Sequence, residues 1–224
     1  MRTGRPGMNR LNMRALALLA GALLLSGAAQ AGAIVAKVLD KAGKPMGDAV
    51  IYAVPVGTPL PAFTAPAQPV QVLQEDMEFK PYVTVVRTGT PVAFVNKDPH
   101  EHHIKSFGPA KEFEFKISTS SPPPIVFDRA GNSVVVCYLH GWMRAHIHTV
   151  DTPWFAVSGA DGLVRIANVP NGDYELRAWH PDTLAPPLVM KLKVSDVTPL
   201  QEVKFDHLPR KRRSKPSQSG YQGE

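Results

Sequence analysis

The pattern of short β-type segments separated by turns constrains the fold of this chain more than any other feature of its sequence. Segments rich in Val, Ile, Thr, Tyr and Phe alternate with clusters of Gly, Asp, Asn and Pro. Ala160-Asp161-Gly162 and Asn171-Gly172-Asp173 are strong turn signals, because glycine and the Asx side chains tolerate the backbone conformations that turns require. No long stretch shows a helical period. The sequence therefore predicts an all-β protein, a sandwich or a barrel.

The expected strands fall into groups separated by a proline-rich segment. Residues 55–69 contain five prolines, which preclude regular structure, so we expect a linker or a long loop there. The strands that we expect cover residues 34–39, 49–54, 70–73, 77–79, 82–87, 91–96, 104–107, 112–117, 125–127, 133–138, 163–166, 173–179, 188–194 and 201–205.

The first 31 residues have the features of a secretory signal peptide. Arg2, Arg5, Arg10 and Arg14 precede an apolar run, Ala15 to Leu25, and Ala29-Gln30-Ala31 matches a small-residue cleavage pattern. The alternative is a membrane anchor, but the apolar run is shorter than the roughly 20 residues of a spanning helix. We therefore expect residues 1–31 to be removed on export, with no stable membrane insertion.

The net charge of +6 comes from the two ends of the chain. Four basic residues lie in the expected signal peptide, and residues 209–224 add five more with one acid. The body between them is slightly acidic, so nucleic-acid binding is not expected, because that function needs a basic patch on a folded face. The tail, residues 209–224, is poor in apolar residues and is predicted to be disordered.

Cys137 is the only cysteine of the chain. In an exported protein, a single thiol is buried and inert, paired with another chain, or held by a metal. His140 and Met143 follow Cys137 at intervals of three residues, and a histidine cluster at residues 100–103 precedes it. One thiol, two imidazoles and a thioether are the ligands of blue-copper sites. Zinc is the competing metal, but structural zinc sites favour several cysteines.

Residues 70–150 resemble the cupredoxin family, the group of plastocyanin and amicyanin. The resemblance is carried by Phe94-Val95-Asn96, by His102-His103-Ile104 and by Val136 to Met143, and the short loop is most similar to amicyanin-like and methylamine-utilisation-associated members. It implies a Greek-key β-sandwich, one type 1 copper ion and single-electron transfer between periplasmic partners. The ligands that it implies are His102, Cys137, His140 and Met143.

The choice of the upstream histidine is open among three residues. In the family, the ligand precedes a small or polar residue and then a β-branched one, and His102 fits that pattern. His103 would then point to the opposite face of its strand. His100 is expected in an exposed loop. Alternation alone cannot set the register, so His100 and His103 remain alternatives to His102.

The remaining segments, residues 34–54 and 155–206, resemble the two ends of a carboxypeptidase-regulatory, prealbumin-like β-sandwich. The resemblance is carried by Asp40 to Pro45, Asp161 to Ile166 and Gly172 to Leu176. If both resemblances hold, the copper domain is inserted into this second sandwich. Two sandwiches in series, or one enlarged sandwich, are the alternatives. A scaffolding or partner-docking role is expected for this unit.

Four further residues near the expected site carry hypotheses of their own. His146, His148 and His180 are expected to be ordinary surface histidines, with a second metal ion as the alternative. Trp142 either shields the site from water or lies on a surface where a partner docks.

Together these observations predict a periplasmic blue copper protein that carries single electrons between redox partners, such as a cytochrome or a dehydrogenase. The alternative is a copper-binding delivery or sensing module. Enzyme activity is not expected, because the sequence shows no second metal constellation, no Ser/His/Asp set and no paired carboxylates.

Overall fold

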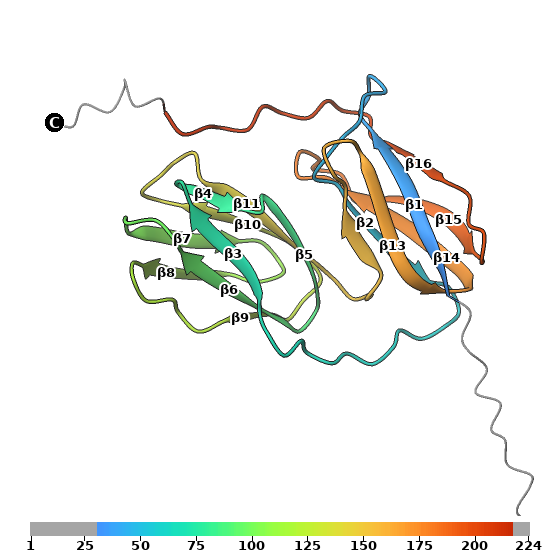
Figure 1. The fold of residues 1–224 in the computed structure, drawn as a ribbon, viewed down its shortest axis with the longest axis horizontal. Coiled ribbons are helices and arrows are strands. Elements are labelled where there is room, and N and C mark those ends of the chain that lie inside the picture. The colour runs from blue at the N-terminus through green and yellow to red at the C-terminus, as the bar shows by residue number, and fades with distance from the viewer. Residues whose placement is uncertain (1–30, 217–224) are drawn as a thin grey trace, which may run out of the picture.

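The computed structural model describes residues 31–216 and shows two β-sandwiches side by side (Figure 1). The described residues form sixteen strands in four sheets and contain no helix. The all-β prediction is confirmed. No segment within this range is a helix able to span a membrane. The expected signal peptide lies outside the described residues, apart from Ala31.

The first sandwich joins the two ends of the described chain. Its sheets have the strand orders β13-β1-β16 and β12-β2-β14-β15. Alternation along β1 turns Ile34, Ala36 and Val38 into the core, where they meet Ile51 and Leu176. The strands are β1 (Ala31–Leu39), β2 (Val50–Pro55), β12 (Phe155–Val157), β13 (Leu163–Pro170), β14 (Gly172–Trp179), β15 (Leu188–Val194) and β16 (Gln201–Lys204).

The second sandwich contains the residues between these ends. Its sheets have the orders β4-β3-β6-β9 and β5-β11-β10-β7-β8. Phe94, Ile104, Phe127, Val135 and Ile147 fill the core between them. The strands are β3 (Val70–Glu75), β4 (Glu78–Lys80), β5 (Val83–Arg87), β6 (Thr90–Asn96), β7 (His102–Phe107), β8 (Phe113–Ile117), β9 (Ile125–Phe127), β10 (Gly131–Cys137) and β11 (Arg144–Val150).

Two connections link the sandwiches. The proline-rich segment that follows β2 has no regular structure and leads to β3, and a short turn leads from β11 back to β12 (Figure 1). In the first sandwich, β1 pairs with β13 and β16, and β2 pairs with β12 and β14. Strands that precede the second sandwich in the sequence therefore pair with strands that follow it, and together they form the sheets of the first sandwich.

Strand β11 lies where the sandwiches meet. It was not among the expected strands, yet it pairs with both β5 and β10. Ala145 and Ile147 face the core of the second sandwich, and Val150 joins a third apolar cluster with Tyr52 and Trp179 of the first. Both faces of β11 are therefore buried.

The expectation that the surplus histidines lie at the surface is wrong. His146, His148 and His180 are only 4%, 5% and 4% exposed. His146 and His148 lie on β11, and His148 stacks on the Trp179 ring with 4.5 Å between ring centroids. His146 and His148 occupy the polar positions of a strand with alternating residue types. These positions face the first sandwich instead of water.

The start of the basic tail differs from the expected disorder. Residues 209–216 have no helix or strand, but they contact both sandwiches. The Arg210 amide donates to Oδ2 of Asp182 at 2.7 Å, and Arg212 forms an ion pair with Asp48 while its guanidinium lies 3.9 Å from the Tyr82 ring centroid. Carboxylates and an aromatic face on the folded body therefore provide partners for these basic residues.

Candidate metal centre

His102 enters the site as the first residue of β7. Alternation along this strand buries His102, Ile104 and Ser106 and turns the intervening residues outward. His102 is completely buried, whereas Nε2 of His103 points away and lies 2.8 Å from Oε1 of Glu114. His100 is exposed. The strand therefore directs His102, and not its neighbours, towards the core of the second sandwich.

Cys137 enters the site at the end of the neighbouring strand, β10. Its register partner on β7 is Ile104, two residues beyond His102, and its side chain is 3% exposed. The chain then turns back on itself, because the Cys137 amide donates to the Met143 carbonyl at 3.3 Å and the Met143 amide donates to the His140 carbonyl at 2.9 Å. These two hydrogen bonds fold the loop so that His140 returns to the thiol.

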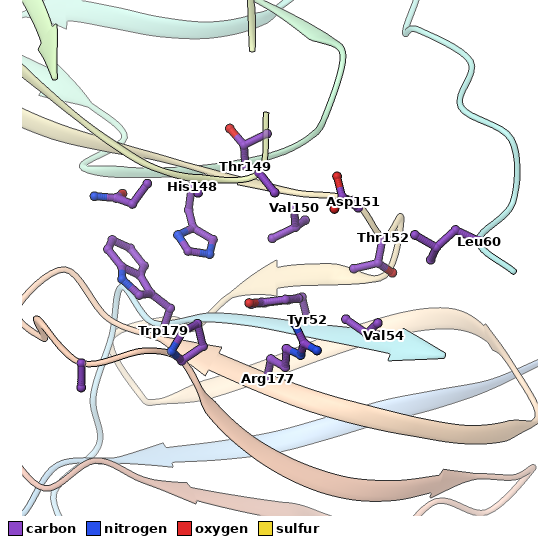
Figure 2. Close-up of a pocket in the computed structure, with 15 residues that line it drawn as sticks. Tyr52, Val54, Leu60, His148, Thr149, Val150, Asp151, Thr152, Arg177 and Trp179 are labelled. Atoms are coloured by element: carbon purple, nitrogen blue, oxygen red, sulfur yellow. The ribbon is translucent and has the colours of Figure 1, made fainter. Parts of the chain in front are cut away.

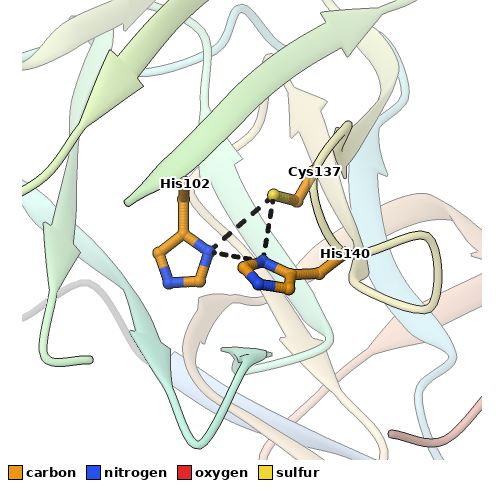
Figure 3. Close-up of side chains that lie close together, drawn as sticks. All are labelled: His102, Cys137 and His140. Atoms are coloured by element: carbon orange, nitrogen blue, oxygen red, sulfur yellow. Dashed lines mark hydrogen bonds between the residues drawn. The ribbon is translucent and has the colours of Figure 1, made fainter. Parts of the chain in front are cut away.

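Three side chains converge at this point (Figure 3). Sγ of Cys137 lies 3.7 Å from Nδ1 of His102 and 3.5 Å from Nδ1 of His140, and the two Nδ1 atoms are 3.2 Å apart. Among the described residues, these three form a group whose ligand atoms could hold one metal ion. His102 thus meets Cys137 and His140, which lie 35 and 38 positions further along the chain.

Met143 lies in the same apolar core as Cys137. It is 2% exposed and belongs with Cys137 and Ile104 to one buried cluster. The structure thus places all four residues of the expected ligand set in one sandwich, three of them in mutual contact and Met143 in the same buried core as Cys137.

Asp98 belongs to the candidate site, although its place there was not predicted from the sequence. Its Oδ2 accepts a hydrogen bond from Nε2 of His102 at 2.9 Å and another from the Met77 amide at 3.0 Å. The Asp98 amide in turn donates to Oδ1 of Asn96 at 2.9 Å, which holds the carboxylate in place. An acidic residue four positions before a candidate ligand histidine was the available signal.

Trp142 covers one side of the site. Its Nε1 donates to the Met77 carbonyl at 3.0 Å, and its ring lies 5.4 Å from the His140 ring. Tyr138 and Leu139, the two residues after Cys137, are each 52% exposed. The loop therefore combines a shielding indole with an apolar outer surface.

The contacts of the site also shift its pKa values. Burial lowers the pKa of His102, but hydrogen bonds to Cys137 and Asp98 outweigh burial, so the pKa of this histidine is raised. Burial raises the pKa of the Cys137 thiol, but hydrogen bonds from His102 and from the backbone outweigh it, so the pKa is lowered. For His140, burial and the neighbouring His102 both lower the pKa. The lowered pKa values favour the thiolate of Cys137 and the neutral form of His140, which are the forms that bind metal. The raised pKa of His102 favours its protonated form, so metal binding at His102 must displace a proton.

The chemistry of the donors fits copper. A buried thiol, two imidazole nitrogens and a thioether in the same core are soft or borderline donors, which copper prefers. The Asp98 hydrogen bond keeps the proton of His102 on Nε2, and Nδ1 is then free to coordinate a metal.

Comparison with solved structures finds cupredoxins. Amicyanin from Paracoccus versutus is 21% identical, with a TM-score of 0.34, over 44% of this chain and 98% of that one. A purple cupredoxin from Nitrosopumilus maritimus is 20% identical, with a TM-score of 0.32, over 36% of this chain and 99% of that one. Comparison with protein families and with curated proteins finds no match.

The expectation that the chain is not an enzyme is overturned by another structural match. A copper-containing nitrite reductase from Thermus scotoductus SA-01 is 26% identical, with a TM-score of 0.35, over 43% of this chain. The match spans 25% of the length of the reductase. A copper enzyme thus stands among the matches, and the lack of a catalytic pattern in the sequence did not justify excluding enzyme activity.

Proposed function

We propose that this protein is a periplasmic type 1 copper protein that carries single electrons. The observation that carries the proposal is the convergence of His102, Cys137 and His140, with ligand atoms within 4.8 Å of one another, inside the cupredoxin-like sandwich. His102, Cys137, His140 and Met143 would hold one copper ion, which when bound supplies the one-electron change between Cu(I) and Cu(II).

The residues around the candidate ligands hold them in fixed positions, which supports electron transfer. His102 is fixed by Asp98, and its β7 backbone is paired to both β8 and β10. Cys137 lies at the end of a central strand, and Trp142 is anchored to the Met77 carbonyl. A site held in this way changes little between oxidation states, and the apolar surroundings exclude water.

The route for the electron is the outer side of the loop. His140 is partly exposed, and Tyr138 and Leu139 present apolar surface beside it. A cytochrome or a dehydrogenase that docks there would approach the site through His140. We further propose that residues 1–31 direct export to the periplasm and that the first sandwich serves as a scaffold for the inserted copper domain.

The geometry favours a carrier over a copper delivery or sensing module. Surplus histidines near the site were the feature that supported delivery. Within residues 31–216, however, the group that could hold a metal contains only His102, Cys137 and His140. His146 and His148 are buried against Trp179 of the first sandwich, and His180, which follows β14 in the first sandwich, is buried as well.

Electron exchange tests this function directly. Reduced, copper-loaded protein is mixed with ferric cytochrome c in a stopped-flow instrument, and copper retention is measured afterwards. We expect rapid, reversible exchange without loss of copper. His102→Gln should abolish exchange, while the matched variant His103→Gln should retain it. Release of Cu(I) to an acceptor without electron exchange would contradict the carrier function and support delivery.

A further inference from the structure

A groove of about 510 Å³ lies between the two sandwiches, on the side of the candidate copper loop. One wall belongs to the second sandwich and includes Trp142 and Met143, and the facing wall includes Asp182 of the first. Residues 210–214 of the tail form a third side, and Figure 1 shows this segment running from the first sandwich past β4 and β11. The groove adjoins the candidate copper site, because the Trp142 ring lies 5.4 Å from the His140 ring.

The tail side of the groove is held by contacts with both sandwiches. The Arg210 amide donates to Oδ2 of Asp182 at 2.7 Å, and Arg212 forms an ion pair with Asp48. The Arg212 guanidinium also lies 3.9 Å from the centroid of the Tyr82 ring. These contacts hold the backbone of the tail across the groove without using the Arg210 guanidinium.

The two sandwich walls are joined by aromatic contacts. His146 lines the groove, and its ring lies 5.7 Å from the Trp179 ring. His148, two residues further along β11, stacks on Trp179 with 4.5 Å between ring centroids (Figure 2). The walls of the groove are therefore part of a packed contact between domains.

Positive charge dominates the lining of this groove, which we call the basic groove. Its basic and acidic lining residues are Arg144, Arg210, Lys211, Arg212 and Arg213, with Glu78 and Asp182. Arg212 is paired with Asp48, but the other four basic side chains are exposed and form no ion pair within residues 31–216. Burial and the charge of Arg144 lower the pKa of His146 to about 4, so this lining residue is neutral at pH 7.

Four unpaired cations in one groove favour an anionic occupant. Like charges that are held close together repel one another, and an opposite charge between them relieves this repulsion. The body of the chain between its two basic ends is slightly acidic, so the positive charge of the groove is a local feature. Such a feature attracts a negatively charged surface to this place and not to the rest of the molecule.

The size and the place of the groove favour a protein segment over a single small anion. A volume of about 510 Å³ accommodates several side chains. An acidic segment presents several carboxylates in a row, which suits cations on the tail and on a sandwich wall at the same time. A protein bound there also lies beside Trp142 and therefore beside the candidate copper site.

We propose that the basic groove docks an acidic surface segment of the redox partner, one rich in Asp and Glu. The four unpaired cations bind its carboxylates, which places the partner against the Trp142 side of the candidate copper loop. Charge complementarity of this kind raises the rate of association and selects among partners. The identification of the occupant as a redox partner rests on the proposed electron-carrier function, whereas the binding of an acidic segment is measured without copper.

Hexaglutamate and hexalysine peptides are the probes, because they match in length and differ in the sign of their charge. Each is titrated into the metal-free protein while the indole N–H signals of its three tryptophans are followed by nuclear magnetic resonance. We expect hexaglutamate to shift the Trp142 signal and to leave that of Trp154 in place, and we expect no binding of hexalysine. Raising the salt concentration from about 50 to about 300 mM should weaken hexaglutamate binding at least about tenfold, because salt screens exposed charges.

Three results would overturn the proposal. One is equal binding of both peptides, and another is hexaglutamate binding without a shift of Trp142. The third is a Trp142 shift produced as readily by sulfate as by hexaglutamate, which would show a small-anion site instead of a docking site for a protein segment.

Charge reversal locates the bound peptide. Arg144→Glu and Arg213→Glu should each weaken hexaglutamate binding at least about fivefold, whereas Lys193→Glu, at an exposed position of β15, should leave it unchanged. Equal weakening by all three variants would show a general effect of net charge and contradict the assigned site. Because Arg213 lies in the tail, outside both sandwiches, its variant decides the question if Arg144→Glu fails to fold.

The docking site and the electron-carrier function can fail separately. Hexaglutamate binding by a protein that gives no thiolate–copper spectrum would refute the carrier function and with it the redox partner. A protein with that spectrum whose Trp142 signal does not respond to hexaglutamate would refute the docking site alone.

Discussion

Nε2 of His102 donates a hydrogen bond to Oδ2 of Asp98 at 2.9 Å, while Nδ1 of the same ring lies 3.7 Å from the Cys137 sulfur. One carboxylate thus sets which nitrogen of His102 carries the proton and which faces the thiol. Because the Asp98 side chain is only 7% exposed, this hydrogen bond is shielded from water. The orientation of a ligand depends here on a residue that touches no other candidate ligand.

Replacing Asp98 by alanine should weaken copper binding by about 10- to 100-fold, the usual effect of losing a hydrogen-bond partner of a ligand histidine. Asp98→Asn, which keeps an acceptor oxygen, should lose less. Competition with a chromophoric chelator measures the affinity. Asp128→Ala removes an exposed carboxylate that pairs with Lys111 and should have no effect. Equal affinities for Asp98→Ala and the unmodified protein would show that Asp98 does not orient His102.

Met143→Leu should raise the reduction potential of the copper-loaded protein. The substitution removes a weak donor, and the loss of a donor disfavours the more highly charged Cu(II). The side-chain volumes are similar, so the fold should lose less than about 1.5 kcal/mol. Potentiometric titration measures the potential. Met46→Leu, in the core of the first sandwich, is the matched control and should leave it unchanged. An unaltered potential in Met143→Leu would exclude Met143 as a ligand.

The metal-free protein should lose stability as the pH falls from about 6.5 to about 4. Burial and the charges of Arg144 and His180 lower the pKa of His146 to about 4, although Asp182 opposes them; burial and His146 do the same for His148. The unfolded chain, with ordinary histidine pKa values, binds more protons in this range, so acid favours unfolding. At pH 5 the loss should be on the order of 2 kcal/mol for each histidine.

Urea denaturation at pH 7 and pH 5 measures this loss. His148→Phe should make the free energy of unfolding less dependent on pH, because it removes one of the three buried histidines, His146, His148 and His180, whose pKa is lowered to about 4. His100→Phe, in the exposed loop, should leave the pH dependence unchanged. A pH dependence in His148→Phe equal to that of the unmodified protein would show that His148 is not held neutral by burial.

Trp179→Ala should destabilise the contact between the sandwiches by about 3–5 kcal/mol, because a large buried ring is lost. Trp179 is 7% exposed and stacks on His148 across the contact. Differential scanning calorimetry should then show the two sandwiches unfolding in separate transitions. Leu184→Ala, at a side chain that is 99% exposed, is the control and should change the stability by less than about 0.5 kcal/mol. A single unshifted transition in Trp179→Ala would contradict this role.

Most strands could be predicted because each has one face towards a core and one towards water or a polar edge. Strand β1 is an example, with its regular alternation of buried and partly buried residues. Strand β11 could not be found in this way. Its histidines occupy the positions that alternation assigns to solvent, but a second domain covers them, and the pattern of a single strand contains no information about that domain.

The candidate ligand residues could be predicted from the sequence, but the residues that hold them in position could not. The spacing of Cys137, His140 and Met143 and the upstream histidine cluster are local patterns with known metal chemistry. Asp98 and the Met77 carbonyl act through contacts between loops that are distant in sequence from one another and from Trp142 but close in space. Such contacts depend on the packing of the two sheets, which the spacing of residues along the chain does not specify.

The visible absorption and electron paramagnetic resonance spectra of the Cu(II)-loaded protein, compared with those of Cys137→Ser, test the central claim most directly. A thiolate bound to Cu(II) gives an intense blue charge-transfer band, and we predict this band in the unmodified protein and its loss in the variant. A colourless protein, or a weak spectrum that Cys137→Ser leaves unchanged, would contradict a thiolate–copper centre and with it the proposed electron transfer.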